Sequence, residues 1–117
     1  MATMTYELLS GSTNGKGIKV AATATAGTTI HTAVAGATDI DQVYLYAMNT
    51  DGSDRKLTLE WGGTTAPDDL IEVTITAESG LTLVAPGLPL QNGLIVKAFA
   101  SSANVITIHG YVHRVDK

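Results

Sequence analysis

The sequence predicts an all-β protein: an antiparallel β-sandwich of jelly-roll-like form, with about eight short strands and an extended N-terminal arm. Two observations lead to this fold class. Thr, Val, Ile and Leu are plentiful, and the branching of Thr, Val and Ile at Cβ favours extended, half-buried strands. Short apolar runs also follow one another at intervals of roughly ten to fifteen residues, with glycine or proline turns between them and no helical period.

Eight runs have the length and composition of strands. They are Ile18–Thr25, Thr28–Ala33, Asp39–Met48, Arg55–Trp61, Leu70–Thr76, Leu81–Ala85, Leu94–Ala100 and Val105–Val115. Connections such as Asn92-Gly93 contain residues that tolerate positive φ or preset a turn. The Gly/Ser/Asn-rich stretch "SGSTNGKG" spans residues 10–17, and it marks the end of an arm predicted over residues 1–16. Residues 17–117 are then expected to form one sandwich domain.

Alternation within the runs predicts which side chains face the core. In Arg55–Trp61, Leu57 and Leu59 fall on one face, and Thr58 and Glu60 fall on the other. The runs 70–76 and 105–115 alternate in the same way. We therefore expect sheets with one apolar inner face and one polar outer face.

Seven apolar or aromatic residues are candidates for a protein interface. The run Val43–Met48 is apolar on both faces, so it is either a central strand or has an outer face that meets another subunit. Trp61, the only tryptophan, suits a core position at a sheet edge and an interface anchor equally well. The candidates are Tyr6, Leu8 and Leu9 in the arm, and Tyr44, Tyr46, Met48 and Trp61 in the sandwich.

The polar stretch Asn49–Asp54 is predicted to be a turn with Asp51-Gly52 at its bend. Counted from Asn49, its oxygen-bearing residues fall at positions one, three and five of a calcium-binding loop. That loop requires glycine at position six, where this chain has Asp54, and it requires flanking helices. We therefore expect no metal ion and no other cofactor.

No motif in the sequence predicts an enzyme. There is no nucleophile elbow, phosphate-binding loop, zinc-protease signature or dinucleotide fingerprint. His109 and His113 share a strand face, but their Cα atoms would lie about 13 Å apart, too far to bind one metal ion directly. These two histidines and His31 are expected in solvent or at an interface. The acidic residues within 68–72 are expected in a solvated loop.

Composition argues against two classes of partner. The net charge is −4 and the seven basic residues are well separated, so no basic run could follow the phosphates of a nucleic acid. No apolar run approaches the roughly 20 residues of a membrane helix, and the start of the chain lacks the features of a signal peptide. The absence of cysteine excludes disulfides and thiol catalysis. We therefore expect a protein made in a cytoplasm, with no nucleic-acid or membrane partner.

Two stretches resemble small structural proteins of tailed bacteriophages. In "TTIHTAVAGATDIDQVYLYAMNTDGSDRKLTLEWGG", a short strand ends in the turn Ala35-Gly36, a second strand leads into an Asn-Thr-Asp turn, and a Thr/Leu-alternating strand follows. In "LTLVAPGLPLQNGLIVKAFASSANVITIHGYV", Pro-Leu precedes Gly-Leu-x-Val and a Ser-Ala-Asn turn precedes the last strand. The resemblance covers roughly residues 28–115, and it departs at Val34, where a proline is common.

The resemblance implies a virion structural protein with a β-sandwich fold and no enzymatic activity, a class that includes capsid decoration (cement) proteins and parts of tails, necks or fibres. Within this class we expect a capsid decoration protein. Such a protein would bind the outer capsid surface as a homotrimer and clamp neighbouring major capsid subunits, with the arm ordering on one of them. Its partners would be the major capsid protein and its own copies. Open alternatives are a tail, neck or fibre component, or a carbohydrate-binding module with several tyrosines on one face. A small β-fold enzyme would need a residue cluster that the sequence does not show.

Overall fold

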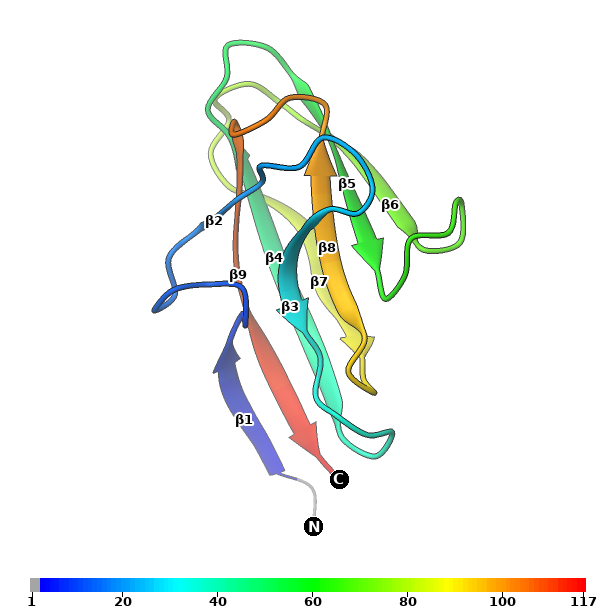
Figure 1. Cartoon of the computed structure of the whole chain (residues 1–117). Coiled ribbons are helices and arrows are strands. Elements are labelled where there is room, and N and C mark those ends of the chain that lie inside the picture. Colours follow the sequence, from blue (N-terminus) through cyan, green and yellow to red (C-terminus); the bar gives the residue numbers. More distant parts are fainter. Residues whose placement is uncertain (1–2) are drawn as a thin grey trace.

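Two antiparallel β-sheets pack face to face, which confirms the predicted all-β sandwich (Figure 1). The structure is a computed structural model that describes residues 3–117. Over these residues it forms nine strands: β1 (Thr3–Leu8), β2 (Ile18–Lys19), β3 (Thr28–Thr32), β4 (Ile40–Asn49), β5 (Arg55–Trp61), β6 (Leu70–Ile75), β7 (Thr82–Leu90), β8 (Ile95–Ala100) and β9 (Ile106–Asp116). The larger sheet has the order β1-β9-β4-β7, with β2 also paired to β9, and the smaller has the order β3-β8-β5-β6.

The connections are those of a jelly roll, as expected. Each strand of the first half pairs with its counterpart in the second half: β2 with β9, β3 with β8, β4 with β7, and β5 with β6. This nested pairing is that of a long hairpin rolled into two sheets, the arrangement of jelly rolls. β1 lies outside the set of eight and adds to β9 on the same side as β2.

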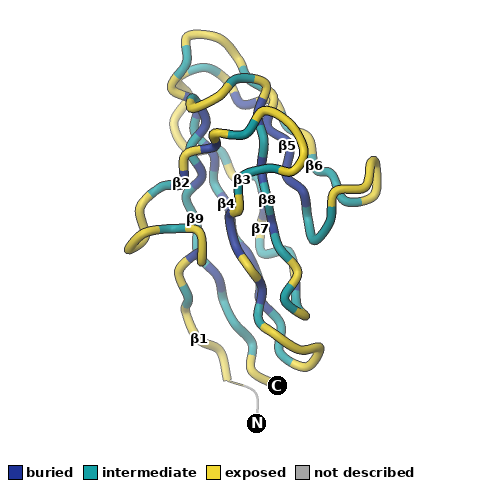
Figure 2. The backbone as a smooth tube through the Cα atoms, viewed as in Figure 1, coloured by how far each residue is buried: buried dark blue, intermediate teal, exposed yellow. Residues whose placement is uncertain are grey.

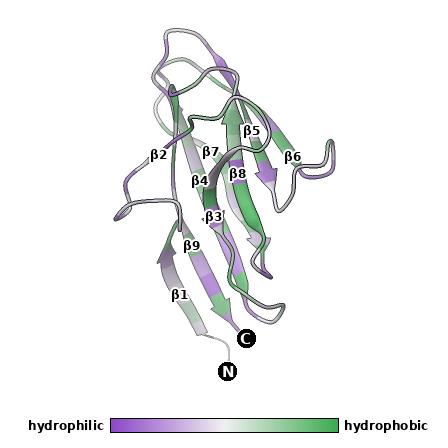
Figure 3. Cartoon of the chain, viewed as in Figure 1, coloured by the Kyte–Doolittle hydropathy of each residue, from purple (hydrophilic) through white to green (hydrophobic). Residues whose placement is uncertain are grey.

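The core lies between the sheets and is built from the inward rows of alternating strands. Val43 and Leu45 of β4 and Leu57 and Leu59 of β5 are fully buried there, and for the two leucines of β5 the alternation predicted this. Figure 2 shows buried backbone running along both sheets, and Figure 3 shows hydrophobic segments in strands of both. At about 25 cal/mol per Å² of apolar area removed from water, this core is the main stabilising term.

Two predictions about β2 and β5 were wrong, and one loop explains both. The run Ile18–Thr25 forms a strand only over Ile18–Lys19, and the chain then crosses the outer face of the smaller sheet. There the Glu60 carboxylate accepts hydrogen bonds from the Thr25 hydroxyl and the Gly27 N–H, both at 2.7 Å. Thr58 and Glu60, predicted to face solvent, are consequently buried.

Residues 3–8 of the predicted arm form β1, which pairs with β9 beside the C-terminus (Figure 1). Leu9 then enters the core and is 2% exposed. Its prediction as an interface residue is therefore corrected, because the fold of a single chain already covers its side chain. The loop that follows is fixed by a hydrogen bond from the Gly11 N–H to the Ile30 carbonyl.

Candidate functional site

All four tyrosines of the chain lie on the outer face of the larger sheet. They come from residues far apart in the sequence, on β1, β4 and β9. We call this surface the aromatic face, and it comprises Tyr6, Tyr44, Tyr46, Met48, Tyr111 and His113. Three of the predicted interface residues, Tyr44, Tyr46 and Met48, are thus brought together with Tyr6.

Register places these side chains together. On β4 the odd-numbered residues from 41 to 49 are buried and the even-numbered ones are partly exposed, so the even-numbered row faces outward. Tyr44 lies opposite Tyr111 of β9, and Tyr6 of β1 lies opposite His113. Because opposite residues of an antiparallel pair share a face, three strands contribute one continuous outer row each.

The rings of three tyrosines form a stack across β4, β9 and β1. The ring centroids of Tyr44 and Tyr111 are 4.8 Å apart with planes inclined by 13°, and those of Tyr111 and Tyr6 are 5.3 Å apart with planes inclined by 10°. His113 lies against all three rings, at centroid distances of 5.2 to 6.0 Å. Aromatic pairs at these separations contribute about 0.5–1.5 kcal/mol beyond their buried area.

The stack starts against the backbone of β7. A Cβ atom on Gly87 would lie 2.7 Å from the Cζ atom of Tyr44, and Gly87 has a φ of +89°, so glycine is required there on both counts. Tyr44 is therefore covered by β7 on one side and by Tyr111 on the other. The stack ends at Tyr6, which is 65% exposed and has no further ring beyond it among the described residues.

The environment of Tyr111 reflects its place in the middle of this stack. Desolvation by the neighbouring side chains raises the pKa of its phenol above the usual value, and the nearby phenols of Tyr46, Tyr44 and Tyr6 act in the same direction. The Tyr111 phenol therefore stays neutral well beyond physiological pH. Together with tyrosine hydroxyls at its surface, this makes the aromatic face a neutral, amphipathic surface.

Charge is placed away from the aromatic face. In the described part of β1, β4 and β9, the outward positions carry no Lys, Arg, Asp or Glu, although the chain as a whole has a net charge of −4. Tyrosine and methionine are enriched at the centres of protein interfaces, and acidic residues and lysine are depleted there. The composition of the aromatic face is that of a protein interface.

The ring geometry is less suited to carbohydrate. A sugar ring stacks on an exposed aromatic face, but Tyr44 and Tyr111 turn their ring faces toward each other. Surface depressions of about 200 Å³ beside Gly62 and about 370 Å³ beside Pro89 are lined by residues other than the tyrosines. The geometry therefore favours a broad protein partner over a small ligand.

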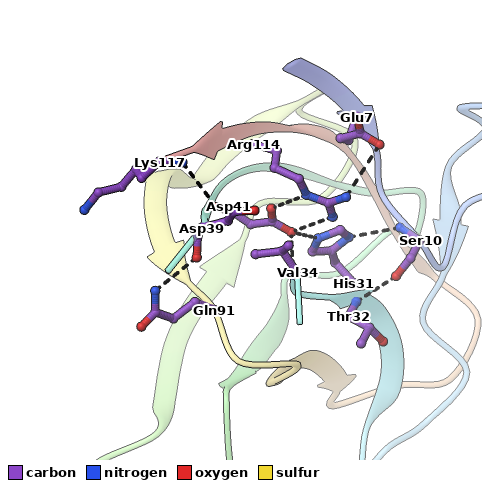
Figure 4. Close-up of polar contacts among 10 residues, drawn as sticks. All are labelled: Glu7, Ser10, His31, Thr32, Val34, Asp39, Asp41, Gln91, Arg114 and Lys117. Atoms are coloured by element: carbon purple, nitrogen blue, oxygen red, sulfur yellow. Dashed lines mark hydrogen bonds and ion pairs between the residues drawn. The ribbon is translucent and has the colours of Figure 1, made fainter. Parts of the chain in front are cut away.

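A buried polar cluster lies on the inner side of the same strands (Figure 4). Asp41 of β4 is fully buried, and its carboxylate accepts hydrogen bonds from Nε and Nη2 of Arg114 at 2.7 and 3.1 Å. Its Oδ2 atom also accepts from Nε2 of His31 at 2.8 Å and from the Val34 N–H at 3.1 Å. This cluster joins β3, β4 and β9 at the end of the sandwich where both termini lie.

The pKa of Asp41 results from opposing effects. Burial by itself would raise it, but the hydrogen bonds from Arg114 and His31, together with the positive charge of Arg114, outweigh burial and hold the pKa below its ordinary value of 3.8. The same hydrogen bond raises the pKa of Arg114. The pair is therefore ionised throughout the physiological range, and Arg114 also lies 3.9 Å from the Glu7 carboxylate on β1.

His31 was predicted to lie in solvent or at an interface, and this prediction was wrong: the residue is 1% exposed. A register shift in β3 between Thr29 and His31 breaks the alternation and turns the imidazole inward, toward Asp41. His109 and His113 are partly exposed, on the outer row of β9. His31 is therefore a structural residue of the cluster.

The cluster contains the residue types of a Ser-His-Asp triad in a different arrangement. Nδ1 of His31 accepts the backbone N–H of Ser10 at 3.0 Å, and the Ser10 hydroxyl accepts the N–H of Thr32 at 2.7 Å. A triad needs the hydroxyl beside the ring nitrogen and an accessible nucleophile. Since a backbone N–H is always a donor, Nδ1 must be unprotonated and Nε2 carries the hydrogen. The cluster fastens the segment after β1 to β3.

The other predicted site residues are placed as follows. Leu8 of β1 is 50% exposed, in the same outward row as Tyr6. Trp61 is partly buried against the core, and its Nε1–H donates to the Pro89 carbonyl at 3.2 Å, which joins the two sheets.

The stretch Asn49–Asp54 is a turn, as predicted. Within it the Asn49 side chain donates to the Ser53 carbonyl and accepts from the Asp51 N–H, and Asp51 binds Arg55. Residues 3–117 contain no group of three or more His, Asp or Glu side chains placed to hold a metal ion, and no helix that could span a membrane.

Comparisons of the chain with models of protein families, with curated proteins and with solved structures returned no match.

Proposed function

We propose that this protein is a structural component of a tailed-phage virion, a decoration protein that binds the outer capsid surface and clamps neighbouring major capsid subunits. The observation that supports a structural role is the aromatic face. Four tyrosines, a methionine and a histidine form one surface without Asp, Glu, Lys or Arg side chains, in which Tyr6 is exposed and the other five residues are partly exposed. The virion setting comes from the resemblance of residues 28–115.

The clamp follows from multivalency. The proposed protein acts as a trimer, and a trimer that holds one capsid subunit with one copy holds the next at a high effective concentration. Each contact can then be weak while the whole assembly dissociates slowly. The aromatic face supplies the contact between copies or with the capsid, because Tyr and Met add large contact area at modest conformational cost.

The test is binding to undecorated shells. We expect the purified protein to be oligomeric by light scattering, to bind shells, and to raise the temperature at which they open. Tyr46→Lys, which places a charge in the aromatic face, is expected to lower shell binding at least about tenfold. Thr74→Lys is the matched control, because Thr74 is exposed on the outer face of the smaller sheet.

A monomer that leaves shells unchanged would overturn the decoration proposal. Binding to purified tails in place of shells would instead assign the protein to the tail or neck. A variant pair with equal binding would show that the aromatic face is not the contact surface.

A further inference from the structure

β1 lies outside the jelly roll, and its outer edge has no neighbouring strand among residues 3–117 (Figures 1 and 2). It pairs with β9 on one side, and five of its six residues are exposed. The backbone N–H and C=O groups along its outer edge are therefore available to another strand.

The two edges of the larger sheet are unlike. Edge strands are commonly protected from pairing by proline, lysine or bulges. β7, at the opposite edge, contains Pro86 and Pro89 and shifts register twice against β4. β1 has the sequence TMTYEL and keeps an unbroken register with β9 over six residues. One edge is protected, and the other is straight and unprotected.

We infer that β1 pairs antiparallel with β1 of a second copy of this chain, about a two-fold axis at Tyr6. With Tyr6 opposite Tyr6 of the second copy, Met4 falls opposite Leu8 and Thr5 falls opposite Glu7. Apolar side chains then meet on the outer face, and Glu7 does not face another carboxylate. Because the side chains of β1 match those of a second β1 in this way, we assign the strand that pairs with the free edge to a second copy of the chain.

The tyrosine stack supports this register. It runs from Gly87 through Tyr44 and Tyr111 to Tyr6, whose outer side is open at the unpaired edge. The structure already shows what two directly opposed tyrosines do, because Tyr44 and Tyr111 stack at 4.8 Å. Tyr6 opposite Tyr6 extends the same stack across the two-fold axis and joins the aromatic faces of two copies.

The C-terminal end of β1 is already fixed within a single copy of the chain. Leu9 is anchored in the core and the Ser10 N–H is bound to His31, so β1 is held in place at its C-terminal end. A strand that is already ordered loses less conformational entropy on pairing than a free arm does. The two-fold contact does not depend on the proposed function; on a shell it would link one trimer to the next.

The absence of cysteine allows a direct test by cross-linking. In the inferred register, the two Cα atoms at position 6 lie about 4.5–5.5 Å apart, within the range of a disulfide. Those at position 8 lie about 14 Å apart, although Leu8 points to the same face. Under mild oxidation of the pure full-length protein, we expect Tyr6→Cys to form covalent dimers at least about tenfold faster than Leu8→Cys.

A mixture of Met4→Cys and Leu8→Cys proteins tests the register further, because these positions face each other across the axis. We expect disulfide dimers that contain one of each, in excess over dimers of either variant alone. Equal or absent cross-linking at positions 6 and 8 would overturn the inference.

A separate measurement tests the same contact without cysteine variants. In sedimentation velocity over a concentration series, Tyr6→Lys is expected to raise the dissociation constant of the two-fold contact at least about tenfold, because two lysines would face each other. Leu81→Lys is the control, since Leu81 is 57% exposed and lies outside β1. Unchanged association of Tyr6→Lys would overturn the inference. No shells are present, so this result is independent of the decoration test.

Discussion

The two arginines of the chain offer a matched test of the buried cluster. Each pairs with an aspartate, and the side chains of Arg114 and Arg55 are 30% and 31% exposed. Their partners differ, because Asp41 is 0% exposed and Asp51 is 29% exposed. Replacing each arginine by methionine removes a similar side chain from a similar environment and leaves behind an aspartate that is buried in one case only.

The expected loss of stability in Arg114→Met depends on which hydrogen bonds Asp41 retains in that variant. Without Arg114, its Oδ2 still accepts from His31 and Val34, but its Oδ1 loses its hydrogen bond. Removing one partner of a buried ion pair costs about 3–5 kcal/mol. Because Arg114 is partly exposed, water can approach in the variant, so we expect about 3 kcal/mol for Arg114→Met. For Arg55→Met, an exposed pair, we expect less than about 1 kcal/mol.

Urea unfolding monitored by the fluorescence of Trp61, at one protein concentration and pH 7, measures both values. In thermal unfolding, 3 kcal/mol corresponds to a fall in Tm on the order of 12 °C for a domain of this size. If the two variants lose the same stability within about 0.5 kcal/mol, the argument from the burial of Asp41 fails. A large loss of stability in Arg55→Met, with little loss in Arg114→Met, would also contradict it.

Three further predictions concern single residues. The pKa of Asp41 lies below 3.8, so its ionised form contributes stability at neutral pH, and this stability is lost as pH falls through the folded-state pKa. The difference in free energy of unfolding between the wild type and Asp41→Asn should therefore shrink below about pH 4. A difference that stays constant with pH would refute this linkage. For His31, 15N NMR should show the tautomer with hydrogen on Nε2, whereas hydrogen on Nδ1 would contradict the bond from Ser10. Gly110→Ala should lower the free energy of unfolding by more than about 2 kcal/mol or prevent folding, because its Cβ would collide with the Tyr44 carbonyl oxygen. Gly52→Ala is the control and should change that free energy by less than about 0.5 kcal/mol, because the space around Gly52 is open. Similar effects at both glycines would contradict this packing.

Local patterns were sufficient to predict much of the fold. The alternation of Leu57 and Leu59 with polar residues predicted β5 with its observed bounds, since this strand packs one face on the core. The apolar faces of Val43–Met48 predicted a central strand or an outer face that meets another subunit, and β4 is central in the larger sheet.

Long-range contacts account for the errors. Glu60 alternates as an outward residue, but nothing local indicates that Thr25 and Gly27 will cover it. His31 is turned inward by a register shift that depends on the partner strand β8. Burial of a polar side chain requires a hydrogen-bond partner, and these partners are distant in sequence.

The aromatic face illustrates the same limit for function. The outward row of β4 was predicted as an interface, but its size depends on Tyr111 and Tyr6, which only the jelly-roll topology and the added β1 bring beside Tyr44. The sequence alone does not determine the order of the strands, so it does not show that the tyrosines at positions 6, 44, 46 and 111 share one face of one sheet.

The two faces of β9 connect stability to assembly. On its inner side Arg114 binds Asp41 and approaches Glu7 of β1, and on its outer side Tyr111 and His113 contact Tyr6 of β1. β1 is therefore fixed through its side chains on both faces, although most of its surface is exposed. An exposed strand held in this way keeps its free edge straight and ordered, and the cost of pairing with a second copy falls accordingly. The buried cluster thus acts on assembly through the position of β1, without contacting the partner.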